Sequence, residues 1–293
     1  MKSLIVLISN PAAKGASCRK IKDARKTLES RGYEVQWLST TRRGDAEEIA
    51  RSSVAKHPSM IIAAGGDGTI NEVINGIAGS RIPLAIIPMG TTNVLAKETG
   101  IPENVHGAVE AALRRTPRDI SIGKISITSP SPVNRFFVLM AGIGYDGETV
   151  SRVDETLKRY SGKGAYIVSG MKTLCGFDPE MLTLRTNGET FHGYSAIIGN
   201  AARYGGNFKV TPEADISAPY LDVCIFQGKS RLDILRYVAG VAAKRHLTFR
   251  DVAYLRAEHV EIQGAAHIQI DGDYLGMAPA RVEVVRDALK LIY

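Results

Sequence analysis

The hydrophobic and polar positions follow two different rhythms along the chain. From the start to about residue 118, short apolar runs alternate with stretches in which apolar residues recur every three or four positions. The runs predict buried strands, and the stretches predict helices with one apolar face. Such alternation is typical of a parallel sheet with helices on both faces. We expect strands at 4–8, 33–37, 60–63 and 84–87, and helices that begin after Gly15, at a cap formed by Asp45, near Thr69, after Asn93 and at Val105.

The pattern changes after Arg118, where short segments of alternating polarity dominate. They predict an antiparallel β domain, and Asn187-Gly188 between two of them is a strong hairpin signal. Two helical stretches interrupt the strands, at about 147–175 and 231–245. The expected strands are 121–127, 134–140, 181–185, 191–198, 220–226, 260–262 and 267–270.

The length of 293 residues is sufficient for two domains, and a hydrophobic content of 44% is ample for their cores. We expect an α/β nucleotide-binding domain over 1–120 and a β-rich domain that binds the second substrate over 121–284. The apolar runs near the end predict that 285–293 return to the first domain.

One glycine-rich stretch combines all the features of a phosphate site. Gly65-Gly66-Asp67-Gly68-Thr69 joins the strand at 60–63 to a helix. Glycines let the backbone approach a polyanion, and the first amides of a helix are unpaired and favour negative charge. The simpler alternative is a tight turn with Thr69 and Glu72 as a capping box. That alternative leaves Asp67 unexplained, since a carboxylate beside phosphates is repulsive unless a metal ion lies between them.

Four loops are expected to meet at one place. Ligands of parallel α/β sheets bind beyond the carboxyl ends of the strands. The loops that begin at Asn10, Thr40, Gly66 and Gly90 all leave that edge, so their residues can converge on one ligand.

The amino-acid composition limits the classes of binding partner that are expected. Lys and Arg number 37 against 30 Asp and Glu, so the net charge of +7 suits an anionic partner. Aromatic residues make up only 6% and no basic run is interleaved with them, which argues against nucleic acid. Cys18, Cys175 and Cys224 have no pairing pattern, as expected of reduced cytoplasmic thiols. No run approaches the ~20 apolar residues of a membrane span, so we expect a cytoplasmic protein that at most rests on the inner membrane surface.

The motifs together are specific. Gly65-Gly66-Asp67-Gly68-Thr69 and Pro88-Met89-Gly90-Thr91-Thr92-Asn93 resemble motifs of the diacylglycerol kinase catalytic domain family, which includes bacterial lipid kinases and the sphingosine and ceramide kinases. The resemblance implies an α/β nucleotide domain like that of NAD kinase and diacylglycerol kinase, followed by an antiparallel β-sandwich-like domain, with a catalytic cleft. It continues through Ser9-Asn10-Pro11, Gly142-Ile143-Gly144-Tyr145-Asp146, residues 199–206, Pro212-Glu213-Ala214 and Asp271-Gly272-Asp273.

The resemblance also implies the ATP site. Glycine amides would reach the phosphates, hydroxyl and amide side chains would donate hydrogen bonds, and Asp67 would act through Mg²⁺ carried by ATP. For Thr40 alone an ordinary loop residue remains an alternative, and residues 90–93 could form only a helix cap. The implied ATP-binding residues are Asn10, Thr40, Gly65, Gly66, Asp67, Gly68, Thr69, Asn71, Glu72, Gly90, Thr91 and Asn93.

Phosphoryl transfer to an alcohol also needs a base. In the family the second acid of the Asp271-Gly272-Asp273 triplet is usually Glu, and it is the proposed proton acceptor. Here Asp273 takes that place with a side chain one methylene shorter, and Asp271 is its expected catalytic partner. The alternative is a solvated Asp-Gly hairpin turn.

A second departure concerns metal binding. After Pro212-Glu213-Ala214 the family usually has an Asp-Asp-Gly-like turn, where an acid helps to hold a structural Mg²⁺. This chain has Ser217-Ala218-Pro219 there. The substitution argues against a structural metal, although Asp215 or Asp222 could substitute as a ligand.

Two basic helical stretches permit two interpretations. Leu232, Leu235, Val238 and Ala242 give the later helix one apolar face. It could rest on anionic lipid, or it could pack its apolar stripe on the core below a solvated basic face, which we prefer. The basic residues are Arg152, Lys158, Arg159, Lys163 and Lys172 in the first stretch, and Arg231, Arg236, Lys244, Arg245 and His246 in the second.

The sequence therefore predicts an ATP- and Mg²⁺-dependent lipid kinase of phospholipid biosynthesis, most simply one that converts diacylglycerol into phosphatidic acid. An NAD kinase-like enzyme and a non-catalytic nucleotide- or lipid-binding relative remain alternatives. The expected partner is a lipid at a membrane surface, and a homodimer stays open.

Overall fold

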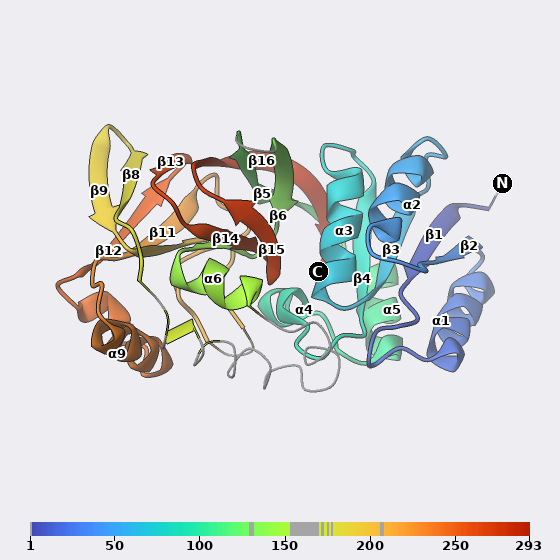
Figure 1. The fold of residues 1–293 in the computed structure, drawn as a ribbon. Helices are drawn as coiled ribbons and strands as arrows, with labels where there is room; N and C mark the ends of the chain where they lie inside the picture. Colours follow the sequence, from blue (N-terminus) through green and yellow to red (C-terminus); the bar gives the residue numbers. More distant parts are fainter. Residues whose placement is uncertain are drawn as a thin grey trace. The chain divides into compact units, whose positions relative to one another are not determined.

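The computed structural model describes residues 2–128, 132–152, 170, 173–174, 176, 178–205 and 208–293 (Figure 1). They form two compact units. The first contains residues up to Ile122 together with Arg286–Tyr293, and the second contains Gly123–Val285. Part of the expected helix at 147–175 lies outside the described residues, as do Lys158, Arg159, Lys163, Lys172, Cys175 and Gly206.

The first unit is built on a parallel sheet. Its neighbouring strands are β2 (Glu34–Ser39), β1 (Leu4–Ser9), β3 (Met60–Gly65) and β4 (Pro83–Pro88), in that order. The register places Ser9 beside Ser39 and Ala64, and Gly65 beside Pro88. All four strands therefore end at the same edge of the sheet, as the sequence predicted.

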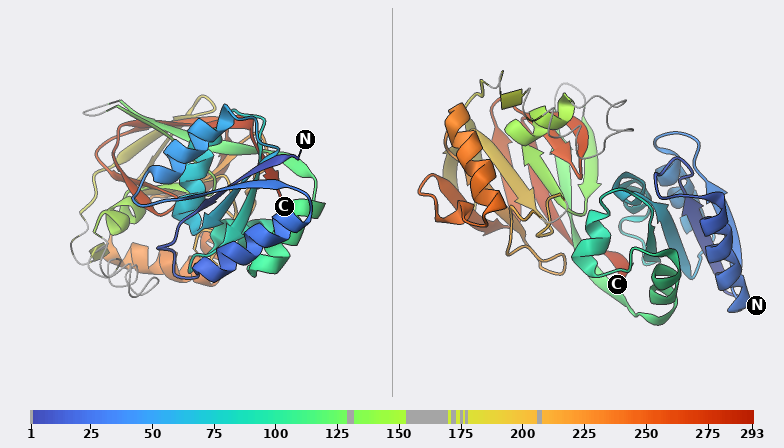
Figure 2. Two further views of the ribbon diagram at one scale, coloured as in Figure 1. Left: turned by 90° about the vertical axis from the view of Figure 1, so that its right-hand side faces the viewer. Right: turned by 90° about the horizontal axis from the view of Figure 1, so that it is seen from below.

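Helices cover both faces of this sheet (Figure 2). The first, α1, buries Ile21, Ala24 and Leu28 on one side and exposes its charged residues, which explains its place on the surface. The chain steps across the sheet from β1 to β2 and then returns past β1 to β3. Because connections between parallel strands are right-handed, this change of side places α2 and α3 on the face opposite α1, whereas α5 packs beside α1. The helices are α1 (Cys18–Ser30), α2 (Asp45–Val54), α3 (Asp67–Ile77), α4 (Val94–Thr99) and α5 (Val105–Arg114).

Two helices begin differently from the prediction. Asp45 does not cap α2, because Gly44 is the N-cap and the Asp45 carboxylate instead accepts hydrogen bonds from the amides of Thr41 and Arg42. The helix α3 begins at Asp67 rather than near Thr69, with Gly66 as its N-cap.

The second unit is an antiparallel sandwich, which confirms the predicted fold class. One sheet has the strand order β12-β11-β10-β7-β14-β15, and the facing strands are β13, β8, β9, β6 and parts of β5 and β16. Buried residues of both layers, such as Leu184, Val260, Ile198 and Val223, share one hydrophobic core. The helices α6 (Tyr145–Ser151) and α9 (Arg231–Ala242) and the short 3₁₀ helix His246–Thr248 lie between strands in sequence.

The strands of this unit, three of which the sequence did not predict as strands, have these bounds: β5 (Pro117–Ile127), β6 (Val133–Phe137), β7 (Met140–Ile143), β8 (Leu182–Thr186), β9 (Glu189–Gly193), β10 (Ser195–Gly199), β11 (Leu221–Phe226), β12 (Val252–Ala257), β13 (His259–Gln263), β14 (His267–Ile270), β15 (Asp273–Met277) and β16 (Ala280–Ile292). The strands β5 and β16 contribute residues to both units. The unpredicted strands are β12 and β15, whose sequences alternate weakly, and β16, for which the sequence predicted only apolar runs that return to the first domain.

Two expected strands are each divided in two. Residues 134–140 form parts of β6 and β7, which belong to different sheets, and residues 191–198 form parts of β9 and β10, which also belong to different sheets. An unbroken apolar run crosses the first place, from Phe136 to Met140, so the sequence pattern does not reveal the change of sheet there. The Asn187-Gly188 hairpin between β8 and β9 is confirmed, with φ angles of 52° and 78°.

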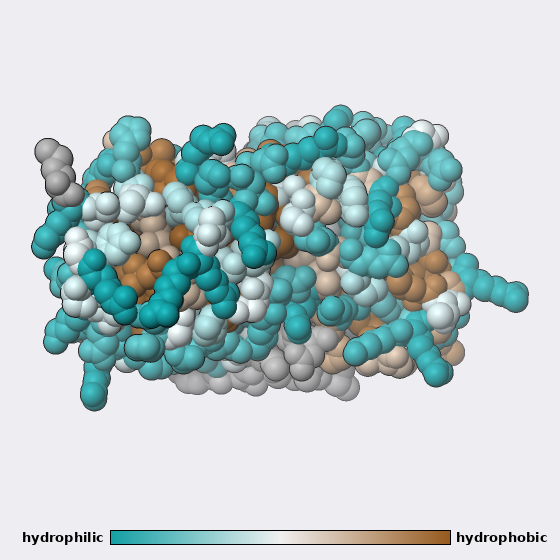
Figure 3. All heavy atoms as spheres, turned by 180° about the vertical axis from the view of Figure 1, so that it is seen from behind, coloured by the Kyte–Doolittle hydropathy of each residue, from teal (hydrophilic) through white to brown (hydrophobic). Residues whose placement is uncertain are grey.

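No helix among the described residues is long and apolar enough to cross a membrane. On the face drawn in Figure 3, hydrophobic residues form small separate patches among hydrophilic ones. Such scattered exposure is normal for a protein surface.

Candidate active site

Two glycine loops touch at the edge of the parallel sheet. A Cβ atom on Gly90 would lie 2.8 Å from the Cα of Gly66, so the loops after β3 and β4 pack backbone against backbone. The amide of Met89 donates to the carbonyl of Gly65 at 2.8 Å and fixes this contact. The residues predicted from the two separate motifs therefore lie together, and glycine is required where they meet.

The loop after β1 is tied to the same place. The side-chain amide of Asn10 donates to the Thr69 hydroxyl at 3.0 Å, and its backbone amide donates to Ala64. Farther along this loop, the amide of Gly15 donates to the carbonyl of Met89 at 2.9 Å. The Thr69 hydroxyl therefore accepts a hydrogen bond from Asn10. Thr69 does not cap the helix, since α3 begins at Asp67. The capping-box alternative is wrong.

Asp67 lies half-buried at the first position of α3, facing the start of α4. The amide of Leu95 donates to its Oδ1 at 3.4 Å. Burial raises the pKa of Asp67, while the amides of Val94 and Leu95 and the charge of Lys97 oppose that rise. The site thus holds one carboxylate among backbone donors, close to the glycine loops.

Asn93 shapes the second glycine loop. Its backbone is left-handed, with φ of 49°, and its Oδ1 accepts a hydrogen bond from the amide of Gly90 at 2.8 Å. Its Nδ2 donates to Glu103 at 3.0 Å. Asn93 is the N-cap residue of α4, as the cap alternative expected, but its buried side chain makes no capping hydrogen bond and instead fixes the direction of the Gly90 amide.

Glu72 links α3 to the start of α2. Its two carboxylate oxygens accept the amides of Gly44 and Ala46 at 3.0 and 3.2 Å, at the positive end of α2. Both oxygens are thus engaged within the fold, whereas the sequence placed Glu72 among the nucleotide contacts. Of the other predicted residues, Thr40 and Asn71 are buried, while Gly68 and Thr91 are exposed.

The Asp271-Gly272-Asp273 triplet forms a tight turn between β14 and β15. Asp271 and Gly272 have φ of 48° and 86°, as in an Asp-Gly hairpin. The Asp271 carboxylate accepts the amides of Val138 and Leu139 at 2.9 Å and of Met140 at 3.0 Å. Asp271 is therefore not a solvated turn residue, because its carboxylate anchors the turn. Asp273 begins β15 and is half-buried.

A buried polar network next to this turn was not predicted. The Nε2 of Gln269 donates to Oδ2 of Asp146 at 2.6 Å, and its Oε1 accepts the amide of Gly272 at 2.7 Å. The Tyr204 hydroxyl donates to the other Asp146 oxygen. Burial raises the pKa of Asp146, and these two donors oppose the rise. A glutamine inside the apolar strand at 267–270 was the available signal.

The Gly142-to-Asp146 motif has a packing explanation. A Cβ atom at Gly142 would collide with the Asp146 carboxylate. Gly142 thus leaves the space in which Asp146 meets Gln269. This motif supports the network rather than a contact with a ligand.

An arginine side chain, Arg256, lies among the acidic residues near the altered turn. Oδ1 of the exposed Asp215 accepts the amide and hydroxyl of Ser217 at 2.8 and 2.7 Å. The Arg256 guanidinium lies 3.7 Å from the buried Asp222 and 3.1 Å from Glu213. Burial raises the pKa of Asp222, and Tyr254 and Arg256 oppose the rise. Among the residues that the structure describes, no three His, Cys, Asp or Glu side chains form a metal-binding group.

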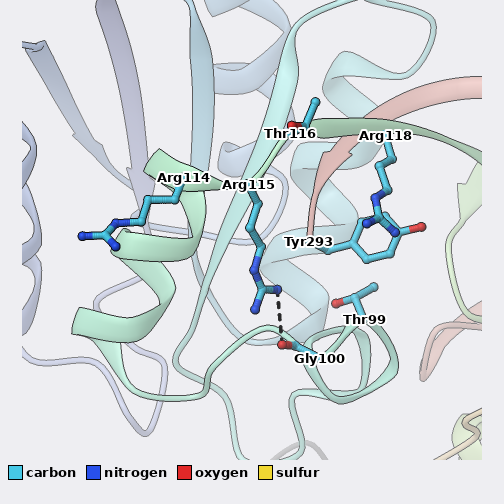
Figure 4. A pocket seen from close by; sticks show the side chains of 7 residues that line it. All are labelled: Thr99, Gly100, Arg114, Arg115, Thr116, Arg118 and Tyr293. Carbon is cyan, nitrogen blue, oxygen red and sulfur yellow. Dashed lines mark hydrogen bonds between the residues drawn. The ribbon is translucent and has the colours of Figure 1, made fainter.

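A separate pocket of about 580 Å³ lies in the first unit (Figure 4). Arg115 donates to the carbonyl of Gly100 at 3.3 Å across it, and Arg118 lies over the Tyr293 ring at 5.1 Å. None of its lining residues is a predicted site residue. They are Thr99, Gly100, Arg114, Arg115, Thr116, Arg118 and Tyr293.

Comparison with known proteins agrees with the geometry. The profile described as "Diacylglycerol kinase catalytic domain" matches residues 4–125, and the profile described as "YegS C-terminal NAD kinase beta sandwich-like domain" matches 140–293. The chain belongs to the diacylglycerol kinase family. It is therefore an enzyme of the kinase class, a phosphotransferase, and the predicted resemblance is confirmed.

Relatives of this family match over most of the chain. A diacylglycerol kinase of Bacillus subtilis is 30% identical over 93% of this chain and 90% of its own. One from Staphylococcus aureus is 31% identical over 96% of this chain and 89% of its own. A crystal structure of a diacylglycerol kinase from Bacillus anthracis superimposes with a TM-score of 0.72 at 19% identity, over 100% of this chain and 97% of that one. The last likeness concerns the fold alone.

Proposed function

We propose that this kinase transfers the γ-phosphoryl group of ATP to the hydroxyl group of a lipid, and that it converts diacylglycerol into phosphatidic acid. The backbone contact between Gly66 and Gly90, directly before the first turn of α3, is the observation that carries the proposal. The names of the curated relatives support the choice of diacylglycerol as acceptor.

The residues present fit a nucleotide. A Cβ at Gly66 or Gly90 would fill the space where the loops meet, so glycine is needed for this close approach of the two loops at the sheet edge. The amides of the first turn of α3 are unpaired within the helix and favour anionic oxygens. In this proposal, Asn10 and Thr69 hold each other in place, and Thr40 and Thr91 contribute polar groups at the same edge.

The residues present also fit a magnesium ion that arrives with ATP. Mg²⁺ keeps several waters and needs only one or two protein carboxylates when phosphates supply the other ligands. Asp67 is such a carboxylate, and the ion would neutralise charge on the phosphates when bound. Asp215 is committed to Ser217, so we do not assign it to a metal.

The proposed base is Asp273. It would accept the proton of the acceptor hydroxyl while the hydroxyl oxygen forms its bond to the γ-phosphorus and ADP leaves. Asp271 and Gln269 would position this residue, since both bind the turn that precedes it. Catalysis would then depend chiefly on positioning and on charge neutralisation.

The test is a direct assay of acceptors. The purified protein is incubated with γ-labelled ATP and, separately, with dispersed diacylglycerol, sphingosine, ceramide, phosphatidylglycerol and NAD, and labelled products are identified by mass spectrometry. We expect label in phosphatidic acid. Label in NAD alone would favour the NAD kinase-like alternative, for which the name of the second matching profile is the motivation.

The non-catalytic alternative gives a different result. ATP binding by calorimetry without ADP release across this panel would overturn the proposal.

A further inference from the structure

The helix α9 has apolar side chains on both of its faces. Ile234 and Tyr237 are buried against the rest of the second unit, to which α9 itself belongs. On the opposite side, Leu232, Leu235 and Val238 are 76%, 50% and 56% exposed. We call these three residues the outer stripe. The preferred interpretation from sequence, that this stripe packs on the core, is wrong, because a different set of apolar residues takes that place.

The inner contacts prevent the helix from turning the outer stripe inward. Tyr237 packs on Phe226 with ring centroids 4.9 Å apart. Gly240 lies so close to the Phe249 ring that a Cβ would be 2.6 Å from it. Ser230 and Asp233 close the first turn with a capping box. The exposure of the outer stripe therefore follows from the way in which α9 packs on its own unit.

Cations lie at both ends of the outer stripe. Arg231 opens the helix, and Lys244 and Arg245 follow its end, and all three are exposed. Within the described part of the chain, no ion pair involves any of them. Arg236 differs, because Asp233 and Asp251 neutralise it. The α9 surface is thus an apolar centre between positive ends.

The surface helix α1 shows the contrast. Its apolar residues Ile21, Ala24 and Leu28 are all buried, and its outward positions are largely charged. An ordinary surface helix of this chain hence hides its apolar residues. The α9 helix buries one apolar set and presents another.

We propose that α9 docks the enzyme on an anionic lipid bilayer. Helices of this kind lie in the interface, with apolar side chains at the acyl boundary and basic residues at the headgroups. In this arrangement Leu232, Leu235 and Val238 enter the bilayer surface, and Arg231, Lys244 and Arg245 bind lipid phosphates. The inference rests on the proposed lipid acceptor for its biological sense, since such an acceptor resides in a membrane.

A second copy of this chain fits the surface less well. Two α9 helices paired about a two-fold axis would bring their unpaired cations close together, which is unfavourable. The outer stripe is also short, because 12 residues of helix span about 18 Å. A stable dimer interface needs roughly 800 Å² from each partner. The positive charges at the ends of α9 therefore favour an anionic partner over a second copy of this chain.

The experiment measures co-sedimentation with vesicles and requires no turnover. The purified full chain is mixed with vesicles of equal phosphatidylglycerol and phosphatidylcholine, and with vesicles of phosphatidylcholine alone. We expect binding to the anionic vesicles only, weakened by added salt. The double substitution Leu232→Ser with Leu235→Ser should weaken this binding roughly tenfold or more, because affinity scales with buried apolar area.

A charge variant and its matched control separate α9 from net charge. Lys244→Glu with Arg245→Glu should likewise weaken binding to the anionic vesicles roughly tenfold or more. Lys2→Glu with Arg81→Glu changes the net charge equally at exposed positions of the first unit and should retain it. Circular dichroism verifies that each variant is folded.

Three results would overturn the inference. They are failure of the unaltered protein to bind anionic vesicles, equal binding by the Leu232→Ser/Leu235→Ser variant, and equal loss in the Lys2→Glu/Arg81→Glu control. Gel filtration tests the alternative that a second copy of this chain binds the α9 surface. A dimer that the Leu232→Ser/Leu235→Ser variant dissociates would assign the surface to self-association. If phosphorylation of diacylglycerol fails while vesicle binding behaves as expected, the proposed function falls and the docking surface stands.

Discussion

Gln269 donates its side-chain amide to the buried carboxylate of Asp146 at 2.6 Å, while its oxygen accepts the amide of Gly272 at 2.7 Å. One side chain thus joins a buried acid to the turn that carries the proposed base. The orientation of the Gln269 amide is determined by both contacts, since Asp146 needs a donor and Gly272 needs an acceptor.

Removing this link should destabilise the second unit. Gln269→Leu removes the donor to one oxygen of the Asp146 carboxylate and the side-chain acceptor of the Gly272 amide, while Tyr204 still donates to the other Asp146 oxygen. The expected loss in the free energy of unfolding is about 1–3 kcal/mol, measured by urea denaturation. Leu keeps the volume, so packing loss is small. An unchanged midpoint would mean that the network contributes nothing to stability.

The contact between the two glycine loops should be intolerant of a methyl group. In Gly90→Ala the new Cβ would lie 2.8 Å from both the Cα of Gly66 and the Oδ1 of Asn93. We expect kcat/KM for ATP to fall at least roughly tenfold, because a small displacement of positioning groups has a large effect on transfer. Gly205→Ala is the control, because nothing lies within 4 Å of its Cβ. Similar losses in both variants would contradict a specific role for the loop contact.

The ionisation of Asp67 should appear in the pH profile. Burial raises its pKa above the ordinary value of 3.8. If the ionised form is required, kcat/KM should fall on the acid side at a pH above that value, as the carboxylate takes up a proton. Asp67→Ala should abolish turnover while the fold survives. Activity that remains near normal in this variant, with an unchanged acid limb, would exclude the proposed role.

The length of the proposed base can be tested directly. Asp273→Asn removes the proton acceptor with little change in shape and should reduce kcat by about 10²-fold or more. Asp273→Glu keeps the acid and extends it by one methylene, so it should retain measurable turnover. Both variants should bind ATP as the unaltered protein does, measured by calorimetry. If Asp273→Asn turns over normally, the base lies elsewhere.

Part of this site could be predicted from local patterns. Parallel strands end at one edge, so the loops at Asn10, Thr40, Gly66 and Gly90 had to gather once the strands were identified. The Asn187-Gly188 turn was equally predictable, because both residues accept a left-handed backbone.

The contacts made over long separations could not be predicted. Nothing in the residues near Asp271 indicates that its carboxylate captures amides more than a hundred positions earlier. The changes of sheet between β6 and β7 and between β9 and β10 were missed for a related reason. Alternation reports which side of a strand is buried, but it does not report which sheet buries it. The exposure of Leu232 likewise depends on which face of α9 the Phe226 and Phe249 rings engage.

The anchoring of Asp271 has a consequence for local motion. Its carboxylate holds the amides of Val138, Leu139 and Met140, at the point where the chain leaves one layer of the sandwich for the other. These amide hydrogens should exchange with solvent only when both layers open together, so they report global unfolding of that unit. The turn that precedes Asp273 is tied to these amides, and we expect it not to fray independently as an exposed loop would.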